Sequence, residues 1–300
     1  MKKNCLIIGF GSAGQRHFRI LQKKKIFKNF YVFSKSLILP NMIRIKNFNN
    51  LERLNLGYII ISSETSLHYS QYLKVQNIKN VKILIEKPVF NFLPDKIKFK
   101  KNVFVGYNLR FNPVIQFLKN FLSKNNAFLL QIECGYYLPF WRPKRSYAKT
   151  YSAIKKKGGG VLNDLSHEID YVLWFLKKLN LMQSYKKKIS DLKINSEDIS
   201  IINCSSKKVK LVTFNLNYLS KTLTRNIKVE TKNHTLICDI IKNEILIFSN
   251  HKKRKKISWP KDPGYSKTYD KMHTDILSPG KGNSATLIDG INVLKFINNI

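Results

Sequence analysis

Residues 5–17, with the sequence CLIIGFGSAGQRH, decide the fold of this chain. The uninterrupted apolar run Cys5–Ile8 is typical of a strand that is buried in a parallel sheet. The run passes directly into the glycine-rich turn Gly9-Phe10-Gly11-Ser12-Ala13-Gly14, and the apolar spacing after it predicts a helix over about residues 13–24. A strand, a turn and a helix in this order indicate the start of an α/β domain.

A G-x-G-x-x-G turn between a strand and a helix is suited to binding a dinucleotide. Its first glycine permits a tight turn, its second lets the backbone approach a pyrophosphate, and its third lets the helix pack closely on the strand. The diphosphate then lies on the N–H groups at the start of the helix. We therefore expect a cofactor to contact the turn at Gly9, Gly11, Ser12, Ala13 and Gly14.

The rest of the first third alternates strands and helices. Short apolar runs predict strands at Phe30–Phe33, Tyr58–Ile61, Lys82–Ile85 and Val103–Val105. Thr65 or Ser66 can cap a helix between two of these strands. Because strands separated by helices imply right-handed crossovers, we predict a Rossmann domain with a doubly wound parallel sheet over residues 1–107.

Beyond residue 107 the pattern changes. Asn112-Pro113 opens a helix, and Gly158-Gly159-Gly160 leads into another that runs to Lys177. Strands are predicted at Ala127–Tyr137, Ile199–Cys204, Val209–Tyr218, Arg225–Glu230, Thr235–Asp239 and Glu244–Phe248. We predict for residues 108–300 an α+β domain with an open, mainly antiparallel sheet that binds substrate and forms a homo-oligomer, a dimer or tetramer. A closing helix within residues 284–300 can pack back on the first domain.

Composition excludes several classes of protein. With 43% hydrophobic residues in 300, the chain can bury a sizeable core, and no apolar run approaches the roughly 20 residues that cross a bilayer. The first apolar stretch is too short for a signal peptide, so we expect a cytoplasmic protein without a membrane partner. The widely separated cysteines have no clustered histidines beside them, which indicates buried thiols and no metal site.

The formal charge of +36 makes nucleic-acid binding an alternative function. The lysines are spread over the whole chain, however, and the densest basic run, residues 251–256, is expected to be a solvated loop. No zinc-finger spacing or RNA-binding signature accompanies that run. Nucleic-acid binding is therefore the least favoured function.

The sequence also indicates which dinucleotide is bound. An NAD site normally carries an acid at the end of the second strand for the ribose hydroxyls. This chain has no Asp or Glu before Glu52, and Ser34-Lys35 stands at the expected place. Since a hydroxyl followed by a cation suits a 2′-phosphate, we expect Ser34 and Lys35 to favour NADP(H) over NAD(H).

Two motifs carry the expected chemistry. Glu86-Lys87-Pro88 follows a buried strand, at the sheet edge where ligands bind in such folds. There Lys87 can donate a hydrogen bond to a substrate oxygen while Glu86 holds it in place. In the second motif, the window Asp164–Asp170 holds three acids and His167, although the chain has only 18 acids. A histidine with a flanking carboxylate is a suitable general base; the structural alternative is a capped helix whose histidine is satisfied by a neighbour.

These motifs together resemble the Gfo/Idh/MocA family, the glucose–fructose oxidoreductase and inositol dehydrogenase group. The resemblance runs through GFGSAGQRH, IISSETSLH (60–68), EKP (86–88), GYNLRFNP (106–113), the GGG…D..H..D segment and the closing helix. It implies a Rossmann domain joined to an α+β domain, with hydride transfer at the hydroxyl or carbonyl carbon of a sugar, sugar nucleotide or polyol. It also implies catalytic roles for Lys87, His167 and Asp164. The residues that line the cofactor would include Ser63, Thr65, His68, Glu86 and Lys87.

A narrower resemblance is to family members from bacterial pathways for nonulosonic acids and other surface sugars, carried by YLPFWRP (137–143), TYSA (150–153) and LSHEIDY (165–171). The substrate contacts it implies are Lys87, Asn108, Arg110, Trp141, Arg142, Tyr151, Asp164 and His167. Many relatives place the acid four residues before the histidine, whereas here Asn163 stands at that position and Asp164 three before. Which side chain orients His167 therefore stays open, as do a dinucleotide-binding protein without catalysis and a reductase of a non-sugar carbonyl or imine.

The cofactor preference is tested by titrating the chain with NADPH and with NADH. We expect NADPH to bind more tightly, because Ser34-Lys35 offers a hydroxyl and a cation where an NAD site has an acid. Tighter binding of NADH would contradict the preference.

Overall fold

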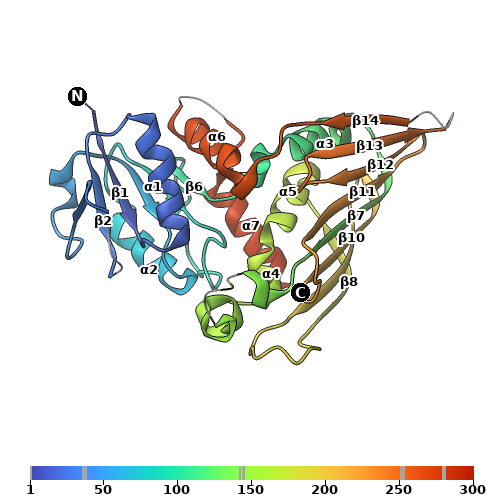
Figure 1. Ribbon diagram of the computed structural model, residues 1–300, viewed down its shortest axis with the longest axis horizontal. Helices are drawn as coiled ribbons and strands as arrows, with labels where there is room; N and C mark the ends of the chain where they lie inside the picture. The colour runs from blue at the N-terminus through green and yellow to red at the C-terminus, as the bar shows by residue number, and fades with distance from the viewer. Residues whose placement is uncertain (1, 36–38, 142, 144–145, 251–253, 279–281) are drawn as a thin grey trace. The chain divides into compact units, whose positions relative to one another are not determined.

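The computed structural model describes the chain except for residues 1, 36–38, 142, 144–145, 251–253 and 279–281. The described residues divide into two compact units, Met1–Asn108 with Asp262–Lys295 and Leu109–Lys261 with Phe296–Ile300. Each unit is built around its own sheet (Figure 1). The predicted fold class, a Rossmann-type parallel sheet followed by a mainly antiparallel one, is confirmed.

The sheet of the first unit has the strand order β15-β6-β5-β4-β1-β2-β3. Neighbouring strands are parallel, except that β15 runs antiparallel to β6. Between β3 and β6 this is the doubly wound order of dinucleotide-binding folds. The strands are β1 (Asn4–Ile8), β2 (Phe30–Phe33), β3 (Met42–Arg44), β4 (Leu56–Ile61), β5 (Lys82–Ile85), β6 (Val103–Val105) and β15 (Ala285–Thr286).

The first unit has apolar inner strands because helices cover its sheet. Every residue of β1 is buried, as expected for a parallel strand that is covered on both faces. The crossover helices are α1 (Ser12–Lys24), directly after β1, and α2 (Thr65–Val75), after β4. Helix α1 begins one residue before its predicted start, and the N-cap of α2 is Glu64 rather than the predicted Thr65 or Ser66.

The first unit is completed by residues far along the chain. After the turn η7 (Pro263–Tyr265), helix α6 (Ser266–Leu277) packs on α1, where Lys24 forms an ion pair of 2.7 Å with Asp270. Helix α7 (Leu287–Asn298) follows β15, and it lies in this unit as far as Lys295. The predicted boundary between residues 107 and 108 lies one residue from the observed division. The second domain does not run unbroken to residue 300, however, because α6 and β15 return to the first sheet.

The sheet of the second unit has the order β14-β13-β12-β11-β7-β10-β9-β8. Neighbours are antiparallel except for β7 and β10, which are parallel. The strands are β7 (Ala127–Gly135), β8 (Asn180–Lys187), β9 (Ile199–Ser205), β10 (Val209–Asn217), β11 (Thr224–Glu230), β12 (His234–Asp239), β13 (Glu244–Ser249) and β14 (Arg254–Ser258).

The helices of the second unit lie on one face of this sheet (Figure 1). They are α3 (Pro113–Lys124), α4 (Val161–Asp164) and α5 (Ser166–Leu176). On β10 the buried Phe214 and Leu216 alternate with the half-exposed Thr213 and Asn215, so one face of the sheet is covered and the other is in contact with water. Short 3₁₀ turns connect the elements. In the first unit this is η1 (Leu51–Leu54), and η2 (Asn108–Phe111) spans the division between the units. The turns of the second unit are η3 (Leu138–Trp141), η4 (Tyr147–Lys149), η5 (Tyr151–Ala153) and η6 (Lys155–Lys157).

Some elements differ from the sequence prediction. The helix predicted after the triple glycine is two helices, α4 and α5, separated at Leu165. The basic run was predicted as a loop, yet Arg254–Ser258 form the edge strand β14, whose exposed lysines suit an edge position; residues 251–253 lie outside the described part. Elements β3, β8 and α6 were not predicted, because their sequences are short or largely polar.

The glycine turn fixes how closely α1 approaches β1. Gly9 has a φ of 88°, and a Cβ on Gly14 would lie 2.2 Å from the Gly9 carbonyl oxygen, so neither position accepts a side chain without a shift of the backbone. Gly11 differs, because a Cβ there would have no heavy atom within 4 Å. The backbone and its packing therefore require glycine at positions 9 and 14, but not at position 11.

This contrast yields a prediction for stability. Gly14→Ala should lower the free energy of unfolding by about 1–3 kcal/mol, because the added methyl must push α1 away from the turn. Gly11→Ala is the matched control and should leave stability nearly unchanged. Chemical denaturation of both variants checks this, and equal losses would contradict the packing argument.

Candidate dinucleotide and acid–base sites

The start of α1 is open to a ligand. No side chain caps the helix at Gly11, and its first turn contains no acid, so the N–H groups there are available to an anion. Ser12 is exposed and Ala13 is half-buried. The free space around Gly11 is what a close-lying diphosphate requires, so the turn fits the predicted cofactor.

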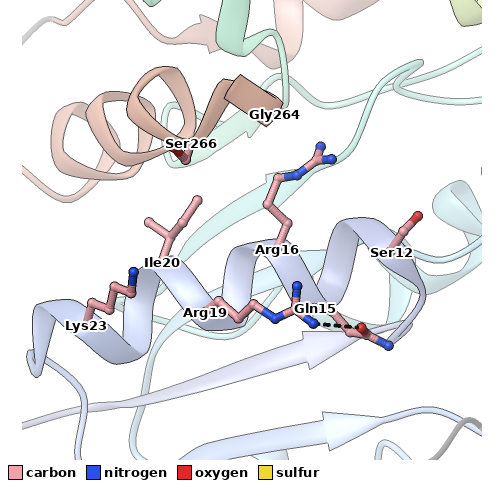
Figure 2. Close-up of a pocket in the computed structure, with 8 residues that line it drawn as sticks. All are labelled: Ser12, Gln15, Arg16, Arg19, Ile20, Lys23, Gly264 and Ser266. Carbon is pink, nitrogen blue, oxygen red and sulfur yellow. Dashed lines mark hydrogen bonds between the residues drawn. The ribbon is translucent and has the colours of Figure 1, made fainter. Parts of the chain in front are cut away.

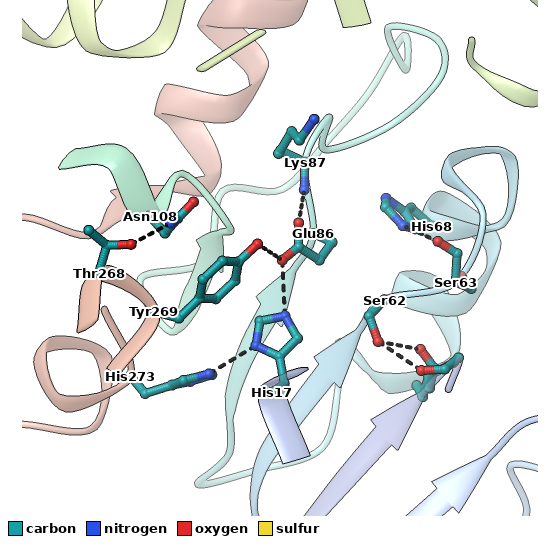
Figure 3. Close-up of polar contacts among 12 residues, drawn as sticks. His17, Ser62, Ser63, His68, Glu86, Lys87, Asn108, Thr268, Tyr269 and His273 are labelled. Atoms are coloured by element: carbon teal, nitrogen blue, oxygen red, sulfur yellow. Dashed lines mark hydrogen bonds and ion pairs between the residues drawn. The ribbon is translucent and has the colours of Figure 1, made fainter. Parts of the chain in front are cut away.

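The residues after β4 are tied to the turn and to the segment after β5. Ser62 Oγ donates to the Gly9 carbonyl at 2.8 Å, and Ser63 Oγ donates to Gln71 at 2.6 Å. His68 is buried, with Nδ1 at 3.1 Å from the Pro88 carbonyl oxygen and Nε2 at 3.2 Å from that of Ser63 (Figure 3). Burial lowers the pKa of His68, against the effect of these carbonyls. His68 therefore connects the backbone after β4 with the backbone after β5.

Thr65, the first residue of α2, is also buried. Both predicted cofactor-lining residues of α2, Thr65 and His68, are thus buried.

The end of β2 carries the residues predicted to select the cofactor. Ser34 is half-buried and Lys35 is exposed. Arg44, at the end of the neighbouring strand β3, donates a hydrogen bond to the Ser34 carbonyl. Arg44 was not among the predicted site residues, because β3 was not predicted from the sequence. The structure thus adds a second cation beside Ser34.

The Glu86 carboxylate is buried directly after β5. It accepts hydrogen bonds from His17 Nε2 at 2.9 Å, from the Tyr269 hydroxyl at 3.3 Å and from the Lys87 backbone N–H at 3.1 Å (Figure 3). Burial acts to raise the pKa of Glu86, but the hydrogen bond from His17, together with Lys87, outweighs it and holds that pKa below its ordinary value. Glu86 is therefore a buried anion that belongs to the protein's internal structure.

Lys87 itself is half-buried, and in Figure 3 its ammonium points away from Glu86. Asn108, predicted to contact substrate, donates instead to Thr268 Oγ1 of α6 at 2.7 Å and is buried. This contact gives Asn108 a structural partner in the first unit.

In the second unit, Asp164 is held by a tyrosine. Its Oδ2 accepts a hydrogen bond of 2.6 Å from the hydroxyl of Tyr218, which stands just past β10. The Tyr218 ring meets Trp141 edge-on at 5.4 Å, and Trp141 Nε1 donates to the Tyr136 carbonyl. From the sequence, Tyr218 was predicted only as the last residue of a strand. Its hydroxyl makes it part of the site.

The remaining acids of the 164–170 window are structural. Asp170 forms a bidentate ion pair with Arg110, in which Nη2 lies 2.6 Å from Oδ1 and both side chains are at most 3% exposed. Glu168 pairs with Arg225 of β11 at 2.8 Å. The high number of acids in this window was the reason to predict catalysis there. Two of the three acids form ion pairs that anchor α5. Arg110, predicted to contact substrate, is enclosed with Asp170 and Trp174.

His167 lies at the start of α5 and is 9% exposed. Asn163, the other residue considered for orienting it, donates to the Gly158 carbonyl at 3.2 Å. Tyr151 is half-buried in a 3₁₀ turn, and Arg142 lies outside the described residues. The triple glycine is needed for packing, since a Cβ on Gly159 would lie 2.2 Å from the Tyr151 carbonyl oxygen.

The predicted site residues fall into two groups. The glycine turn, His68, Glu86 and Lys87 belong to the first unit, while Asp164, His167, Trp141 and Tyr151 belong to the second. Each group is assembled within its own unit by residues that are far apart in the sequence.

A groove of about 380 Å³ in the first unit runs along α1 beside η7 and α6 (Figure 2). It is lined by Ser12, Gln15, Arg16, Arg19, Ile20, Lys23, Gly264 and Ser266. Its lining has cations but no carboxylate or histidine, so it offers no acid–base pair.

Cys5, Cys134, Cys204 and Cys238 are buried thiols. In the part of the chain that the structure describes, no three His, Cys, Asp or Glu side chains gather as metal ligands. Nor does any helix in that part have the length and apolar character needed to span a membrane.

No model of a known protein family matches the sequence, and no curated protein matches it. Solved structures do match along the whole chain. The UDP-N-acetylglucosamine 3-dehydrogenase from Acidithiobacillus ferrooxidans has a TM-score of 0.74 and 12% identity, with coverage of 100% of this chain and 96% of that one. A levoglucosan dehydrogenase in complex with NADH has a TM-score of 0.81 and 12% identity over the same shares.

An oxidoreductase from Thermotoga maritima gives a TM-score of 0.78 with 16% identity, covering 99% of this chain and 95% of that one. At such identities the likeness establishes the fold alone. The chain shares with these sugar dehydrogenases and oxidoreductases a Rossmann-like unit combined with a unit on a mainly antiparallel sheet.

Proposed function

We propose that this chain is an NAD(P)-dependent oxidoreductase that moves hydride to or from a hydroxyl or carbonyl carbon of a sugar, sugar nucleotide or related polyol. The observation that carries the proposal is the open, uncapped start of α1 at Gly11, directly after a buried parallel strand. Two proteins of the same fold support the substrate class, because one is a UDP-N-acetylglucosamine 3-dehydrogenase and another a levoglucosan dehydrogenase with NADH.

Backbone N–H groups of residues 11–14 would hold the cofactor, which would supply or take up the hydride. The chain's own residues manage the proton. Lys87 donates a hydrogen bond to the reacting oxygen, and His167 exchanges the hydroxyl proton. Tyr218 fixes Asp164, which supports the charge that develops on His167. Trp141 and Tyr151 are the proposed substrate contacts that remain in the second unit.

Lys87→Met and His167→Gln should each lower turnover by roughly 10²–10⁴-fold, because each removes a proton-transfer group. Cofactor affinity should change little, since neither side chain belongs to the glycine turn. The assay uses UDP-N-acetylglucosamine, levoglucosan and L-sorbose with either oxidised or reduced cofactor.

The matched control is Lys101→Met, which removes an exposed lysine of the first unit. Near-normal turnover in both site variants would refute the acid–base assignment. Cofactor binding without turnover of any compound in the unmodified protein would favour a binding protein or a non-sugar substrate.

The finer proposal for the cofactor is NADP(H). Lys35 and Arg44 provide two exposed cations at the carboxyl ends of β2 and β3, where the adenosine ribose binds in this fold. An arginine offers a planar fork that suits a phosphate. No acid precedes Glu52 to bind ribose hydroxyls.

Arg44→Ser and Lys35→Ser should each weaken NADPH binding by about tenfold or more, because a charged hydrogen bond is worth roughly 1.5–3 kcal/mol. NADH binding should be unaffected. Arg53→Ser, which removes an exposed arginine before β4, is the control. Equal losses for both cofactors, measured by fluorescence titration, would argue against a 2′-phosphate site.

We also propose a homo-oligomer formed through the outward face of the second sheet. Ile201, Leu211 and Ile237 are 37–44% exposed on that face, on strands β9, β10 and β12. Figure 1 shows no helix of the described second unit covering it. A second copy of the same face would bury these side chains in a two-fold contact.

The double substitution Leu211→Lys with Ile237→Lys should convert the oligomer to a monomer, because it places like charges in the apolar contact. Ile26→Lys, at an equally exposed apolar position of the first unit, is the control. Sedimentation velocity gives the mass. An unmodified protein that is monomeric at tens of micromolar would rule out this interface.

A further inference from the structure

Behind Glu86, the first unit contains a cluster of buried polar rings. His17 of α1, His273 of α6 and Tyr58 of β4 are all 0% exposed. Tyr58 Oη lies 3.0 Å from His273 Nδ1, and His273 Nε2 lies 2.9 Å from His17 Nδ1. His17 Nε2 in turn lies 2.9 Å from Glu86 Oε1 (Figure 3). These contacts form a continuous chain that ends on the carboxylate.

The proton count fixes the direction of this chain. An ionised carboxylate only accepts, so His17 must carry its proton on Nε2. A neutral His17 then accepts at Nδ1, which requires the proton of His273 on Nε2. His273 Nδ1 accepts from the Tyr58 hydroxyl. With this assignment every polar atom of the chain has one partner.

An additional proton breaks the arrangement. If His17 were doubly protonated, His273 would have to donate from Nδ1 to Tyr58, and the Tyr58 proton would need another acceptor. Among the described residues, His273 is the hydrogen-bond partner of Tyr58. Burial also lowers the pKa of His273 well below its ordinary value, helped by His17 and Lys24, and burial raises the pKa of Tyr58.

Glu86, at the end of the hydrogen-bond chain, influences the position of Lys87. Glu86 Oε2 accepts the Lys87 backbone N–H, so the orientation of the carboxylate fixes that peptide. Gly106 packs against the carboxylate, because a Cβ there would lie 3.0 Å from its carbon. Rotation of Glu86 would therefore shift the backbone that carries the Lys87 side chain. Small displacements of a reacting group reduce rates strongly.

We propose that Tyr58, His273 and His17 form a one-way hydrogen-bond chain, each donating to the next, that orients Glu86 and thereby positions Lys87. His17 and His273 are positioning residues. The part of this inference that concerns Lys87 chemistry rests on the proposed function; the direction of the chain does not.

The direction is tested by ¹⁵N NMR of the full-length protein labelled at histidine, with His17→Gln and His273→Gln used for assignment. We expect the Nε2–H tautomer at both histidines, because only this tautomer lets each ring donate toward Glu86 and accept from the other side. The charged and titratable groups nearby are Arg16 and Lys24 on α1, Cys5 on β1, Tyr58 on β4, Tyr269 on α6, and Glu86 with Lys87 after β5. An Nδ1–H tautomer of either histidine would overturn the hydrogen-bond chain.

The link to Lys87 is tested with a matched pair of amides at residue 17. Gln places its N–H₂ near the Nε2 position and keeps a donor to Glu86, whereas Asn reaches only toward His273. In His17→Asn the Lys87 amide proton should exchange with solvent at least tenfold faster and move upfield, and in His17→Gln both properties should stay near those of the unmodified protein. Unchanged exchange in a folded His17→Asn protein would refute the link.

Kinetics with the same pair separate this inference from the proposed function. If the unmodified protein turns over one of the three test compounds, kcat should fall about tenfold or more in His17→Asn, and by less than about threefold in His17→Gln, with KM little changed. Full activity of a folded His17→Asn protein would overturn the positioning role. If no compound is turned over, the proposed function fails. The histidine tautomers and the exchange of the Lys87 amide proton still test whether the hydrogen-bond chain exists. Tyr269→Phe, which removes the longer 3.3 Å contact, should have a smaller effect than His17→Asn.

Discussion

A buried carboxylate must be matched by donors, and in the first unit this requirement falls on Glu86. Its partners come from α1, from α6 and from its own following peptide. Removing one donor leaves a charge that water cannot reach, which costs far more than a surface contact. The need to satisfy Glu86 gives residues near position 270 a reason to pack against a unit whose strands β1 to β6 come from the first 105 residues.

The second unit uses the same principle at three points. Asp164 is matched by Tyr218, Glu168 by Arg225 and Asp170 by Arg110. The chain has only 18 acids against 54 basic residues, yet several of its acids are buried and paired. The abundant lysines are mostly at the surface, where their number changes the field around the protein but not its core.

Much of the fold could be predicted from local pattern. The strands Phe30–Phe33, Lys82–Ile85 and Val103–Val105 have the predicted bounds, because the buried residues of these parallel strands are all apolar. Strand β8 was not predicted because its residues are mostly exposed and polar, and its pairing with β9 stabilises it. Helix α6 was missed because its apolar residues are few and its buried face includes His273.

The site was less accessible from sequence, for a physical reason. Residue type identified Glu86 and Asp164, but the partners that hold these side chains, His17 and Tyr218, come from distant elements. Arg110 and Asn108 had the right chemistry for substrate, and only their contacts with Asp170 and Thr268 show that they are already engaged. Tyr218 and Arg44 carried no sequence signal, since Tyr218 becomes relevant through Asp164 of α4, and Arg44 through Ser34 just past the neighbouring strand β2.

The first unit is assembled from two separated stretches, and this has a consequence for synthesis on the ribosome. Residues 1–108 leave the exit tunnel more than 150 residues before Asp262–Lys295 do. During that interval the parallel sheet can form, but Glu86 lacks Tyr269, and His17 lacks His273. The nascent first unit therefore waits with an incomplete interior, and the whole intervening unit is translated before it can close. Such a chain gains little from the usual order in which an N-terminal domain folds to completion first.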